Sequence, residues 1–502
     1  MFPVVLLLGL FGMTARPATD PDLWWHLRTG QWIVETGHTP HSDPFSFTRT
    51  GQPWVSHEWL SEVVFYETWK HAGAGSLIVF SAIVTSAGFM LLYLRCSGKP
   101  HWAAGATALG ALASVPAWGV RPQMFTFALA SLLLWLLDRG EERPWLLVSV
   151  PPLFLLWLNL HAGFALGLAL ILADAFGLLV EMAMGDTAWR EARPVLVRLL
   201  LLVLACLALV PLNPSGVQLY RYPFDTLRSA AMRSFIVEWF SPNFHELRFI
   251  PFLIVFLLLL VVLARTRARP SARTLVPLGL TTLLALDAVR HIPIFVLLAM
   301  PVIATGLASS SSAVRRHNPS PTAPVRPIFN GLAVVLMAGF ALVRWGVLAR
   351  GQAAVEAQQF PEKAVEALRS RASGGEVFAY YDWGGYAIYR LYPEYRVFVD
   401  GRADLYGDDL LRQFQTAVQL RTGWREVLDR WNVRTVLLPP YCALAQALLL
   451  DPHWHLEYGD SQALVLLGTS RSSQKTAVPT NPSPATEKSA RMLVEPVPDL
   501  RH

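Results

Sequence analysis

Long apolar stretches constrain this chain more than any other feature of its sequence. A short stretch opens the chain, and ten more lie between residues 74 and 346. An apolar helix of about 20 residues spans the hydrocarbon core of a bilayer. Only 16% of the residues are charged, which is low for a soluble protein. We therefore predict a polytopic α-helical membrane protein with about eleven transmembrane helices. Ten of the spans are expected near 74–94, 102–119, 122–137, 145–159, 162–182, 199–212, 249–264, 274–289, 292–308 and 328–346.

The apolar stretches divide the chain into five regions. Residues 1–15 form the first helix, which is short for a span, so we expect the true start codon to lie upstream. Residues 16–72 form a large loop rich in His and aromatic residues, and residues 73–346 form the remaining bundle. Residues 347–468 alternate β-rich runs with helical patterns, which predicts a largely parallel α/β domain closed by a hairpin. Residues 469–502 are polar and aperiodic, which predicts a disordered tail.

Basic residues orient the predicted bundle. With the N-terminus in the cytoplasm, the five cytoplasmic connections hold 14 Lys and Arg residues. The longer opposite connections hold about ten in about 100 residues, as the positive-inside rule requires. The loop 16–72 and the α/β domain are therefore expected to be extracytoplasmic. The net charge of +6 is explained by this arrangement, so we expect no nucleic-acid partner. The three cysteines lack the spacing of a disulfide framework or a zinc site.

Polar residues gather at the outer ends of the predicted helices. Such residues are costly in a bilayer and usually functional, so we predict a cavity that opens to the outside. The competing interpretation is that they are ordinary helix-end and interfacial residues. The group consists of Arg121, Asn159, His161, Asn213, Glu238, Asp287, Arg290 and His291, and Asp174 and Arg344 are exceptions that map elsewhere.

The loop after the first helix opens with an acidic pair. Asp20 and Asp22 flank a proline, and His26 follows one helical turn after Asp22. Such a pair can coordinate a divalent cation, or one carboxylate can act as general base. Asp20 precedes Pro21 and suits an N-cap, whereas Asp22 would stand at the head of a helix, whose positive end would keep it ionised. The alternative is that both residues only cap the helix.

Two further features of the same loop carry side chains suited to catalysis or to sugar binding. His57 and Glu58 form a second acid–base pair. Trp24 and Trp25 could stack on the apolar face of a sugar, or they could belong to an interfacial aromatic belt.

Several segments of the chain resemble the GT-C glycosyltransferases, which use polyprenyl-phosphate-linked sugars at the outer face of the membrane. They are similar in particular to bacterial multispan GT-C-like proteins of unassigned activity. The resemblance covers residues 18 to about 468 and implies a GT-C-like bundle in the bacterial cytoplasmic membrane. The segments are DPDLWWHLRTGQWI, HSDPFSFT, PWVSHEWLSE, VRPQMF, WLNLHAGFALG, LNPSG, IVEWFSP, RHIPIF, YYDWGGY and VFVDGRADLYG.

A second resemblance concerns the C-terminal domain. The run from Tyr380 to Gly384 is similar to the Trp-Trp-Asp-Tyr-Gly motif of the oligosaccharyltransferase catalytic subunit, where the motif helps to bind the acceptor. The two leading tryptophans are replaced by tyrosines here. The resemblance implies acceptor binding by Tyr381 and Asp382, with Asp400 and Arg402 at the next strand end beside them. The competing interpretation is a strand end followed by a Gly-Gly turn, with Asp382 as a helix cap.

These resemblances imply transfer of a sugar from a polyprenyl-phosphate donor to a glycan, lipid or protein acceptor, in contact with membrane lipids. Asp22 or Asp20 would act as the base or as ligands to Mg²⁺ or Mn²⁺, although lipid phosphate leaves readily without a metal. His57 and Glu58 would assist the catalytic carboxylates. Arg121 and Arg290 would neutralise the departing phosphate. The remaining residues expected to bind the donor or substrate are Asn159, His161, Glu238, His291, Trp24, Trp25 and His26.

Three other functions compete with glycosyl transfer. A transporter would need broken helices and internal repeats, and we find no clear repeat. A polysaccharide polymerase or ligase usually carries its large loop late in the bundle. A non-catalytic protein of envelope polysaccharide assembly would keep the fold without needing its carboxylates.

Overall fold

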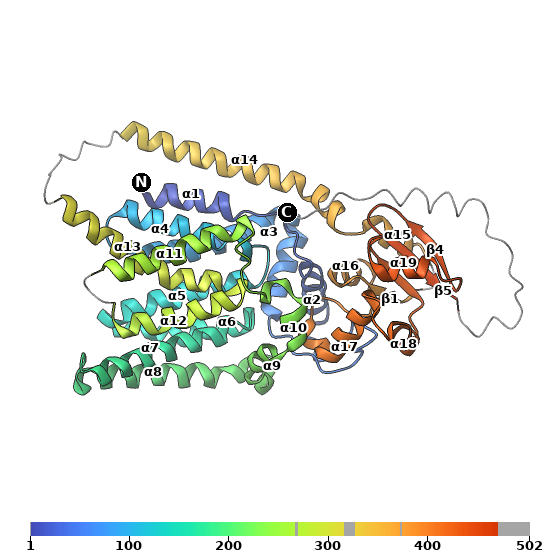
Figure 1. Ribbon diagram of the computed structural model, residues 1–502, viewed down its shortest axis with the longest axis horizontal. Helices are drawn as coiled ribbons and strands as arrows, with labels where there is room; N and C mark the ends of the chain where they lie inside the picture. Colours follow the sequence, from blue (N-terminus) through green and yellow to red (C-terminus); the bar gives the residue numbers. More distant parts are fainter. Residues whose placement is uncertain (1, 267–269, 316–326, 372–373, 470–502) are drawn as a thin grey trace, which may run out of the picture. The chain divides into compact units, whose positions relative to one another are not determined.

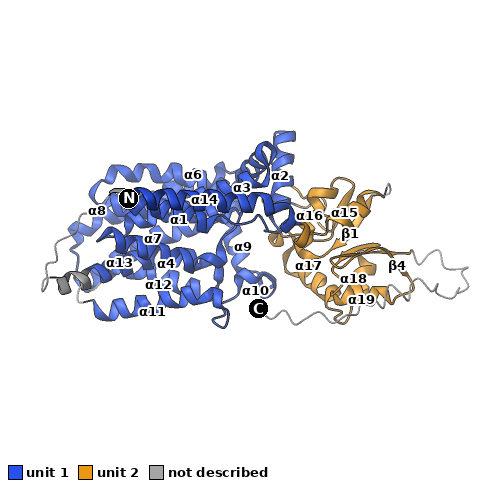
Figure 2. Ribbon diagram, turned by 90° about the horizontal axis from the view of Figure 1, so that it is seen from above, with its two compact units in different colours: residues 1–41, 53–356 blue, residues 42–52, 357–502 orange. Residues whose placement is uncertain are grey.

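The computed structural model describes residues 2–266, 270–315, 327–371 and 374–469 of the chain. Two compact units are present, and Figure 2 colours them separately. Unit 1 comprises residues 1–41 and 53–356, and unit 2 comprises residues 42–52 and 357–502. The middle of the predicted outer loop thus belongs to the C-terminal unit. The predicted tail lies outside the described residues, apart from Thr469.

Unit 1 is helical, and each of the eleven predicted apolar stretches coincides with a helix (Figure 1). Its remaining long helix, α2 (Leu23–Thr36), lies within the predicted outer loop. The helices that match the stretches are α1 (Phe2–Thr14), α3 (Trp59–Arg95), α4 (Pro100–Ala113), α5 (Gln123–Glu142), α6 (Val150–Leu160), α7 (Phe164–Met184), α8 (Trp189–Leu209), α11 (Ile250–Arg265), α12 (Ala272–Asp287), α13 (Ile292–Arg315) and α14 (Pro327–Gln359).

Six helical segments of the described chain are long and apolar enough to cross a membrane. The chain is therefore an integral membrane protein, while the number of eleven crossings stays a prediction. Two shorter apolar helices cover Phe2–Thr14 and Pro144–Leu160. The six longer segments are Trp59–Arg95, Phe164–Met184, Trp189–Leu212, Leu247–Arg265, Val289–Ala308 and Phe329–Gln359.

Helix α3 contains both the end of the predicted loop and the following apolar stretch. It begins at Trp59, so the last part of the predicted loop 16–72 is helical. The two halves meet at Gly73, where φ is 67° and ψ is −170°. Glycine tolerates this left-handed φ, which other residues rarely adopt. The boundary expected at residue 72 is therefore a break within a helix.

Small residues let the helices of the bundle approach closely. A Cβ on Gly110 of α4 would lie 2.6 Å from Cγ1 of Val296 in α13. A Cβ on Gly88 of α3 would lie 2.7 Å from the ring of Phe127 in α5. Such contacts are typical of membrane helices, where close packing rather than the hydrophobic effect holds neighbours together.

The two polar residues that did not map to the outer ends have structural partners. Asp174 in α7 accepts two hydrogen bonds from the guanidinium of Arg273 in α12, at 2.8 and 3.0 Å. Arg344 in α14 donates to the carbonyl oxygens of Gly12 and Ala15. The carbonyls at the end of a helix lack intrahelical partners, so Arg344 caps α1.

Unit 2 is an α/β domain around a five-stranded sheet with the order β2-β1-β3-β5-β4. The strands are β1 (Gly375–Ala379), β2 (Tyr395–Val397), β3 (Thr435–Leu438), β4 (Trp454–Gly459) and β5 (Leu464–Gly468). The helices are α15 (Glu362–Arg369), α16 (Tyr381–Leu391), α17 (Ala403–Val418), α18 (Trp424–Arg430) and α19 (Ala443–Leu449).

The strand pairing confirms part of the sequence prediction. β1 is parallel to β2 and β3, whereas β5 is antiparallel to β3 and β4. The closing hairpin is present, but it makes the sheet mixed rather than largely parallel. The predicted Gly-Gly turn is wrong, because both glycines lie inside α16. A Cβ on Gly384 would lie 2.3 Å from the Val399 carbonyl oxygen, so glycine is needed where α16 packs against the segment that follows β2.

The segment 42–52 lies along the edge strand β2. The Phe47 amide donates to the Val397 carbonyl at 3.1 Å, and the Val397 amide donates to the Phe45 carbonyl at 3.2 Å. An edge strand leaves a row of backbone groups unpaired. The segment satisfies part of that row and so completes the domain.

Candidate active site

The acidic pair lies in the turn that leads into α2. The Asp22 amide donates to Oδ1 of Asp20 at 2.9 Å, so the Asp20 side chain turns toward a local amide. The side chain of Asp22 accepts a hydrogen bond from Nε1 of Trp25 at 3.2 Å. One turn of chain thus holds two carboxyl groups close together.

Two arginines and a glutamate extend this turn into a network of charges. Nε of Arg121 lies 2.5 Å from Oδ2 of Asp20, and its Nη2 lies 2.8 Å from Oε2 of Glu238. Nη1 of Arg290 lies 3.3 Å from Oε1 of Glu238. The guanidinium of Arg290 also lies over the indole of Trp239, 4.5 Å from its centroid. Negative and positive groups therefore alternate, and the structure brings together four predicted site residues.

The network is reachable from outside the protein. The side chains of Arg121, Glu238 and Arg290 are 22–23% exposed, and that of Asp20 is 11% exposed. Ion pairs this close to water keep some freedom to exchange partners, because solvent weakens each attraction. A charged ligand could therefore compete for the arginines.

Burial and charge set the protonation of these groups. Burial and the neighbouring Asp20 charge raise the pKa of Asp22 to about 8. The expectation that the helix end keeps Asp22 ionised is therefore wrong, because these two effects outweigh the helix dipole. Burial alone would raise the pKa of Glu238, but Arg121 and Arg290 bring it below its usual value.

A second group of acids and histidines joins the start of α2 to the start of α3. Nδ1 of His26 lies 3.6 Å from Glu62, and Nε2 of His26 lies 3.9 Å from Glu58. Nε2 of His57 lies 3.6 Å from Glu58. Glu62 is fully buried, and the sequence analysis missed it. The sequence feature that could have identified Glu62 is its spacing of four residues from Glu58, which places both side chains on one helix face.

His57 continues this group toward His161. The ring of His57 lies on Tyr222 with centroids 4.2 Å apart, and 6.3 Å from that of His161. Nδ1 of His161 accepts from the Gly163 amide at 3.0 Å and lies 2.8 Å from the Thr126 hydroxyl. Burial lowers the pKa of His57 to about 4 and that of His161 well below its usual value. Both rings are therefore neutral at pH 7.

Asn159 fixes the ends of neighbouring helices. Its Oδ1 accepts from Nε1 of Trp59 at 2.7 Å and from Nδ2 of Asn213 at 3.2 Å. Asn213 also donates to the His57 carbonyl at 3.3 Å. Asn213 thus holds the backbone beside His57 and is itself held by Asn159. A donor-binding role for Asn159 stays a prediction.

The remaining predicted residues of unit 1 pack against protein. Trp24 is 1% exposed, and Trp25 is 6% exposed with its ring 3.7 Å from that of His26. These indoles show no open face for a sugar, so burial argues against the stacking hypothesis. Nδ1 of His291 lies 3.1 Å from the Leu284 carbonyl oxygen, beside Arg290 in the chain.

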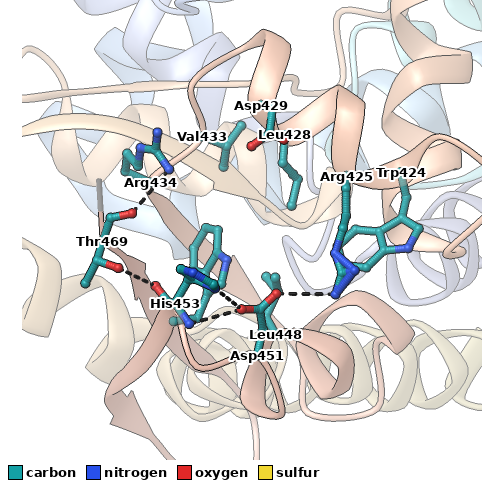
Figure 3. Close-up of a pocket in the computed structure, with 11 residues that line it drawn as sticks. Trp424, Arg425, Leu428, Asp429, Val433, Arg434, Leu448, Asp451, His453 and Thr469 are labelled. Carbon is teal, nitrogen blue, oxygen red and sulfur yellow. Dashed lines mark hydrogen bonds and ion pairs between the residues drawn. The ribbon is translucent and has the colours of Figure 1, made fainter. Parts of the chain in front are cut away.

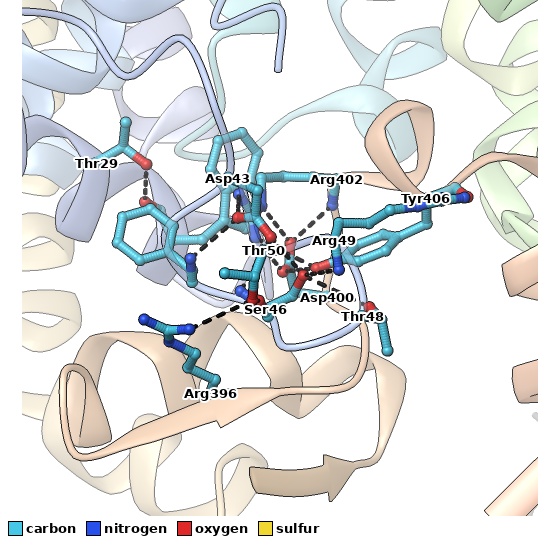
Figure 4. A network of polar contacts seen from close by, with 12 residues as sticks. Thr29, Asp43, Ser46, Thr48, Arg49, Thr50, Arg396, Asp400, Arg402 and Tyr406 are labelled. Atoms are coloured by element: carbon cyan, nitrogen blue, oxygen red, sulfur yellow. Dashed lines mark hydrogen bonds and ion pairs between the residues drawn. The ribbon is translucent and has the colours of Figure 1, made fainter. Parts of the chain in front are cut away.

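Asp400 and Arg402 form the buried centre of unit 2 (Figure 4). Nε and Nη2 of Arg402 donate to the two oxygens of Asp400 at 2.8 and 2.7 Å, and Nη1 donates to Asp43 at 2.8 Å. Asp400 also accepts from the Tyr406 hydroxyl. All three charged residues are at most 1% exposed. Their position indicates that they hold the segment 42–52 in place, and Asp43 was missed by the sequence analysis.

The motif residues that precede them are more accessible. Tyr381 is half-buried and Asp382 is exposed, and both lie in the first turn of α16. An acceptor could reach Asp382 without any rearrangement of the domain. Its predicted role in acceptor binding is compatible with this position and stays a prediction.

The acidic residues do not by themselves supply a metal site. Asp20 is already paired with Arg121. Within the described ranges, no group of three or more His, Cys, Asp or Glu side chains is arranged to hold a metal ion. Metal binding by Asp20 and Asp22 therefore stays a prediction.

The fold is similar to that of archaeal oligosaccharyltransferases. AglB from Archaeoglobus fulgidus, solved with an inhibitory peptide and a dolichol-phosphate, superposes with a TM-score of 0.55 at 11% identity over 95% of this chain and 74% of that chain. An oligosaccharyltransferase from Archaeoglobus fulgidus, tethered to an acceptor peptide with the NVT sequon, gives a TM-score of 0.54 at 12% identity, over 93% of this chain and 74% of that chain. ArnT from Cupriavidus metallidurans bound to undecaprenyl phosphate gives 0.48 at 15% identity, over 94% and 98%.

No protein-family profile and no curated protein matches the sequence. The structural comparison therefore establishes the fold alone. The fold that the resemblance implied is thus similar to that of solved oligosaccharyltransferases.

Proposed function

We propose that this protein is a membrane glycosyltransferase. It moves a sugar from a polyprenyl-phosphate donor to an acceptor at the extracytoplasmic face of the membrane. The N-terminus is cytoplasmic and the α/β domain is extracytoplasmic, as the distribution of basic residues predicts. The acceptor is a glycan, a lipid or a protein.

The observation that carries this proposal is the partly exposed network of Asp20, Arg121, Glu238 and Arg290. Its charges cancel, so an incoming phosphate must displace a carboxylate from an arginine. Arg290 is the better candidate, because its 3.3 Å contact with Glu238 is the longest in the network. A guanidinium suits phosphate oxygens because it offers a planar pair of donors. Arg121, held by two carboxylates, positions Asp20.

Asp22 supplies the base. A carboxylate whose pKa is about 8 accepts a proton far more readily than an ordinary one, and a general base works best with a pKa near the operating pH. As the acceptor oxygen bonds to the anomeric carbon, its proton passes to Asp22. The bond between that carbon and the phosphate oxygen breaks, and Arg290 stabilises the departing phosphate. A single displacement inverts the anomeric carbon.

The other predicted residues support this reaction. Four buried residues of unit 1 orient the bound substrates: His26, His57, Glu58 and His161. A metal is optional in this reaction, because lipid phosphate is already a good leaving group. A requirement for Mg²⁺ or Mn²⁺ stays a prediction of the sequence.

Lipid-linked product analysis in a deletion strain tests the proposal. Loss of the protein should cause a polyprenyl-phosphate sugar to accumulate and one glycan to disappear. Wild type should reverse both effects, whereas Asp22→Asn, which removes the charge and keeps the shape, should not. The matched control is Asp409→Asn, because the Asp409 side chain is 91% exposed in unit 2.

Two results would contradict the proposal. One is an unchanged pool of lipid-linked sugars in the deletion strain. The other is full rescue by Asp22→Asn at normal protein levels. Either result would favour a non-catalytic role in envelope polysaccharide assembly.

A further inference from the structure

Two buried hydrogen-bond donors of unit 1 lie side by side. They are Nε of Arg16, which follows α1, and Nε1 of Trp118, which follows the short helix η1 (Val115–Ala117). In the part of the chain that the structure describes, neither atom finds an acceptor. The Arg16 guanidinium lies over the Trp118 ring, 6.0 Å from its centroid, so both donors belong to one place. Buried donors are nearly always paired in folded proteins, so this pair indicates an acceptor from outside the chain.

Packing holds the Trp118 indole in a fixed position. Its ring contacts the ring of Phe89 in α3, with centroids 5.6 Å apart and planes at 68°. The Ser81 hydroxyl, also from α3, donates to the Gly119 carbonyl at 2.9 Å and so fixes the chain directly after Trp118. A donor that is already in position loses little entropy when an acceptor binds.

The surroundings of Arg16 are positive. Nη2 of Arg344 donates to the carbonyl of Ala15 at 3.3 Å, so a second cation lies next to Arg16. Burial and the Arg344 charge both lower the pKa of Arg16, because both disfavour its positive charge. Among the described residues, no carboxylate pairs with Arg16 to offset these effects. An anion in contact with Arg16 would offset both.

The acidic network is close by in the sequence but differs in charge. Asp20 follows Arg16 by four residues, and Arg121 follows Trp118 by three. There Asp20 and Glu238 both pair with Arg121, so an anion must displace a carboxylate. At Arg16 an anion has no described carboxylate to displace. Arg16 and Trp118 therefore form a site of their own.

The hollow on unit 2 that Figure 3 shows differs in this respect. Its Asp451 accepts from the His453 amide at 3.0 Å and from Nη2 of Arg425 at 3.3 Å. Its cavity volume is about 40 Å³. That space suits a few water molecules, since one water needs roughly 10–15 Å³. The polar groups of the hollow thus pair with one another, and its space is too small for a lipid head group.

The position of Arg16 indicates where the anion comes from. Figure 1 shows α14, which carries Arg344, at the edge of the bundle beside α1. Only 6% of the most apolar stretch of α14 is buried within the protein, so this helix faces lipid. Arg16 stands where the chain leaves the predicted first span. Basic pockets between transmembrane helices bind lipid head groups, and guanidinium N–H groups form strong charge-assisted hydrogen bonds with phosphate oxygens.

We propose that Arg16 and Trp118 bind the phosphate group of a membrane lipid. Arg16 is only half-buried, and a rotation of its side chain gives the phosphate oxygens access to the guanidinium and to Nε1 of Trp118. The charge of Arg344 strengthens the attraction, and the lipid chains lie along α1 and α14. A phospholipid and a polyprenyl phosphate both offer these oxygens. The site is separate from the donor contact at Arg290 and does not depend on glycosyl transfer.

Lipid binding by the full-length protein in detergent, followed by native mass spectrometry, tests this proposal. The probes are phosphatidylglycerol and a polyprenyl phosphate, with diacylglycerol and inorganic phosphate as comparisons. We expect saturable binding of at least one phosphate lipid and none of diacylglycerol. Arg16→Ala and Trp118→Phe should each weaken it about tenfold or more, because each removes a hydrogen bond to a charged group. Trp118→Phe keeps an aromatic ring and removes only the N–H donor.

Matched controls separate this site from general effects of charge and ring size. Arg221→Ala should bind normally, because Arg221 is 85% exposed and lies 4.0 Å from Asp225. Trp145→Phe should also bind normally, because Trp145 is 69% exposed. Arg290→Ala should keep the binding even where it impairs use of the donor. Binding of phosphatidylglycerol would assign the site to bulk lipid, and binding of the polyprenyl phosphate alone would assign it to the carrier lipid.

A measurement on wild type does not depend on how a variant folds. Phenylglyoxal modifies accessible arginines, and the bound phosphate lipid should protect Arg16 but not Arg221. The proposal is overturned if diacylglycerol binds as strongly as the phosphate lipids, if only inorganic phosphate binds, or if Arg16 stays unprotected. Normal binding by both Arg16→Ala and Trp118→Phe, or loss of phosphatidylglycerol binding in Arg290→Ala, would overturn it as well.

Discussion

Asp20 accepts a hydrogen bond from the backbone amide of Asp22 at 2.9 Å, so two acidic residues share one turn at the start of α2. Arg121 lies 2.5 Å from the other oxygen of Asp20 and favours the ionised form, but burial has the larger effect and raises the pKa of Asp20. When Asp20 is ionised, its charge acts on Asp22 and, after burial, is the largest contributor to the raised pKa of Asp22. The turn thus holds two carboxyl groups whose protonation is linked.

The pH profile of transfer follows from this arrangement. Only ionised Asp22 can accept a proton, so the rate should rise with pH, reach half its maximum near pH 8 and level off above it. The measurement is kcat/KM for transfer from a polyprenyl-phosphate sugar between pH 6 and 9.5. A rate that is flat across this range would remove Asp22 from the reaction.

Asp20→Asn should shift that profile in a definite direction. Removing the neighbouring negative charge lowers the pKa of Asp22, so the midpoint should move to lower pH while the burial contribution remains. The maximal rate should fall less than in Asp22→Asn. Loss of the pH dependence in Asp20→Asn would mean that Asp20 itself is the group that titrates.

Arg290→Ala should weaken use of the donor more than it affects stability. We expect at least a tenfold loss in kcat/KM, since a charge-assisted contact to phosphate is worth a few kcal/mol. Arg290→Lys should recover only part of it, because an ammonium group lacks the planar fork. Kinetics with varied donor concentration measure both effects.

The control for this substitution is Arg248→Ala. Arg248 is 53% exposed and pairs with Glu246, away from the network. Its removal should leave donor kinetics unchanged. Equal losses in both variants would point to a general effect of surface charge rather than to a phosphate contact at Arg290.

The buried pair of Arg402 and Asp43 should stabilise unit 2. Arg402→Met leaves two buried carboxylates without their cation, which typically costs about 3–5 kcal/mol. The melting temperature should fall, and the segment 42–52 should become sensitive to limited proteolysis. Arg412→Met is the control, because Arg412 is 54% exposed and an exposed pair contributes at most about 1 kcal/mol. Similar melting of both variants would contradict a structural role for Arg402.

Reporter fusions test the predicted orientation. Fusions after residues 97, 140 and 190 should report the cytoplasm, and fusions after residues 50, 230 and 420 should report the outside. The reason is the excess of basic residues in the first set of connections. A cytoplasmic signal at residue 420 would place the α/β domain on the wrong side for transfer from an outer-face donor.

The sequence predicted the helices well because hydrophobic pattern is a local property. Each apolar stretch matches a helix, and the turn at Asp20 follows from the proline beside it. The sequence predicted less completely which residues form the candidate site. Arg121 lies between Asp20 and Glu238 because segments about a hundred residues apart in the sequence pack together. The spacing of residues along the sequence does not reveal such packing.

The errors have a common physical origin. The helix dipole at Asp22 is local and was foreseen, whereas burial and a neighbouring charge depend on the folded environment. Likewise the pair of glycines after Asp382 resembles a turn in the sequence, although Gly384 is required because the backbone that follows β2 passes close to α16. Glu62 was missed since a lone acid near a helix start is usually solvated.

The ion pair between Asp43 and Arg402 joins residues 359 positions apart, and this separation matters during synthesis. The segment 42–52 is made early, whereas its binding site in unit 2 exists only after nearly the whole chain has left the ribosome. Domains usually fold as they emerge from the ribosome, but the segment 42–52 remains unpaired until β2 has been synthesised. An expressed fragment that starts at residue 357 would lack the segment 42–52, so the edge of β2 would stay open and Arg402 would lose Asp43, one of its two acids.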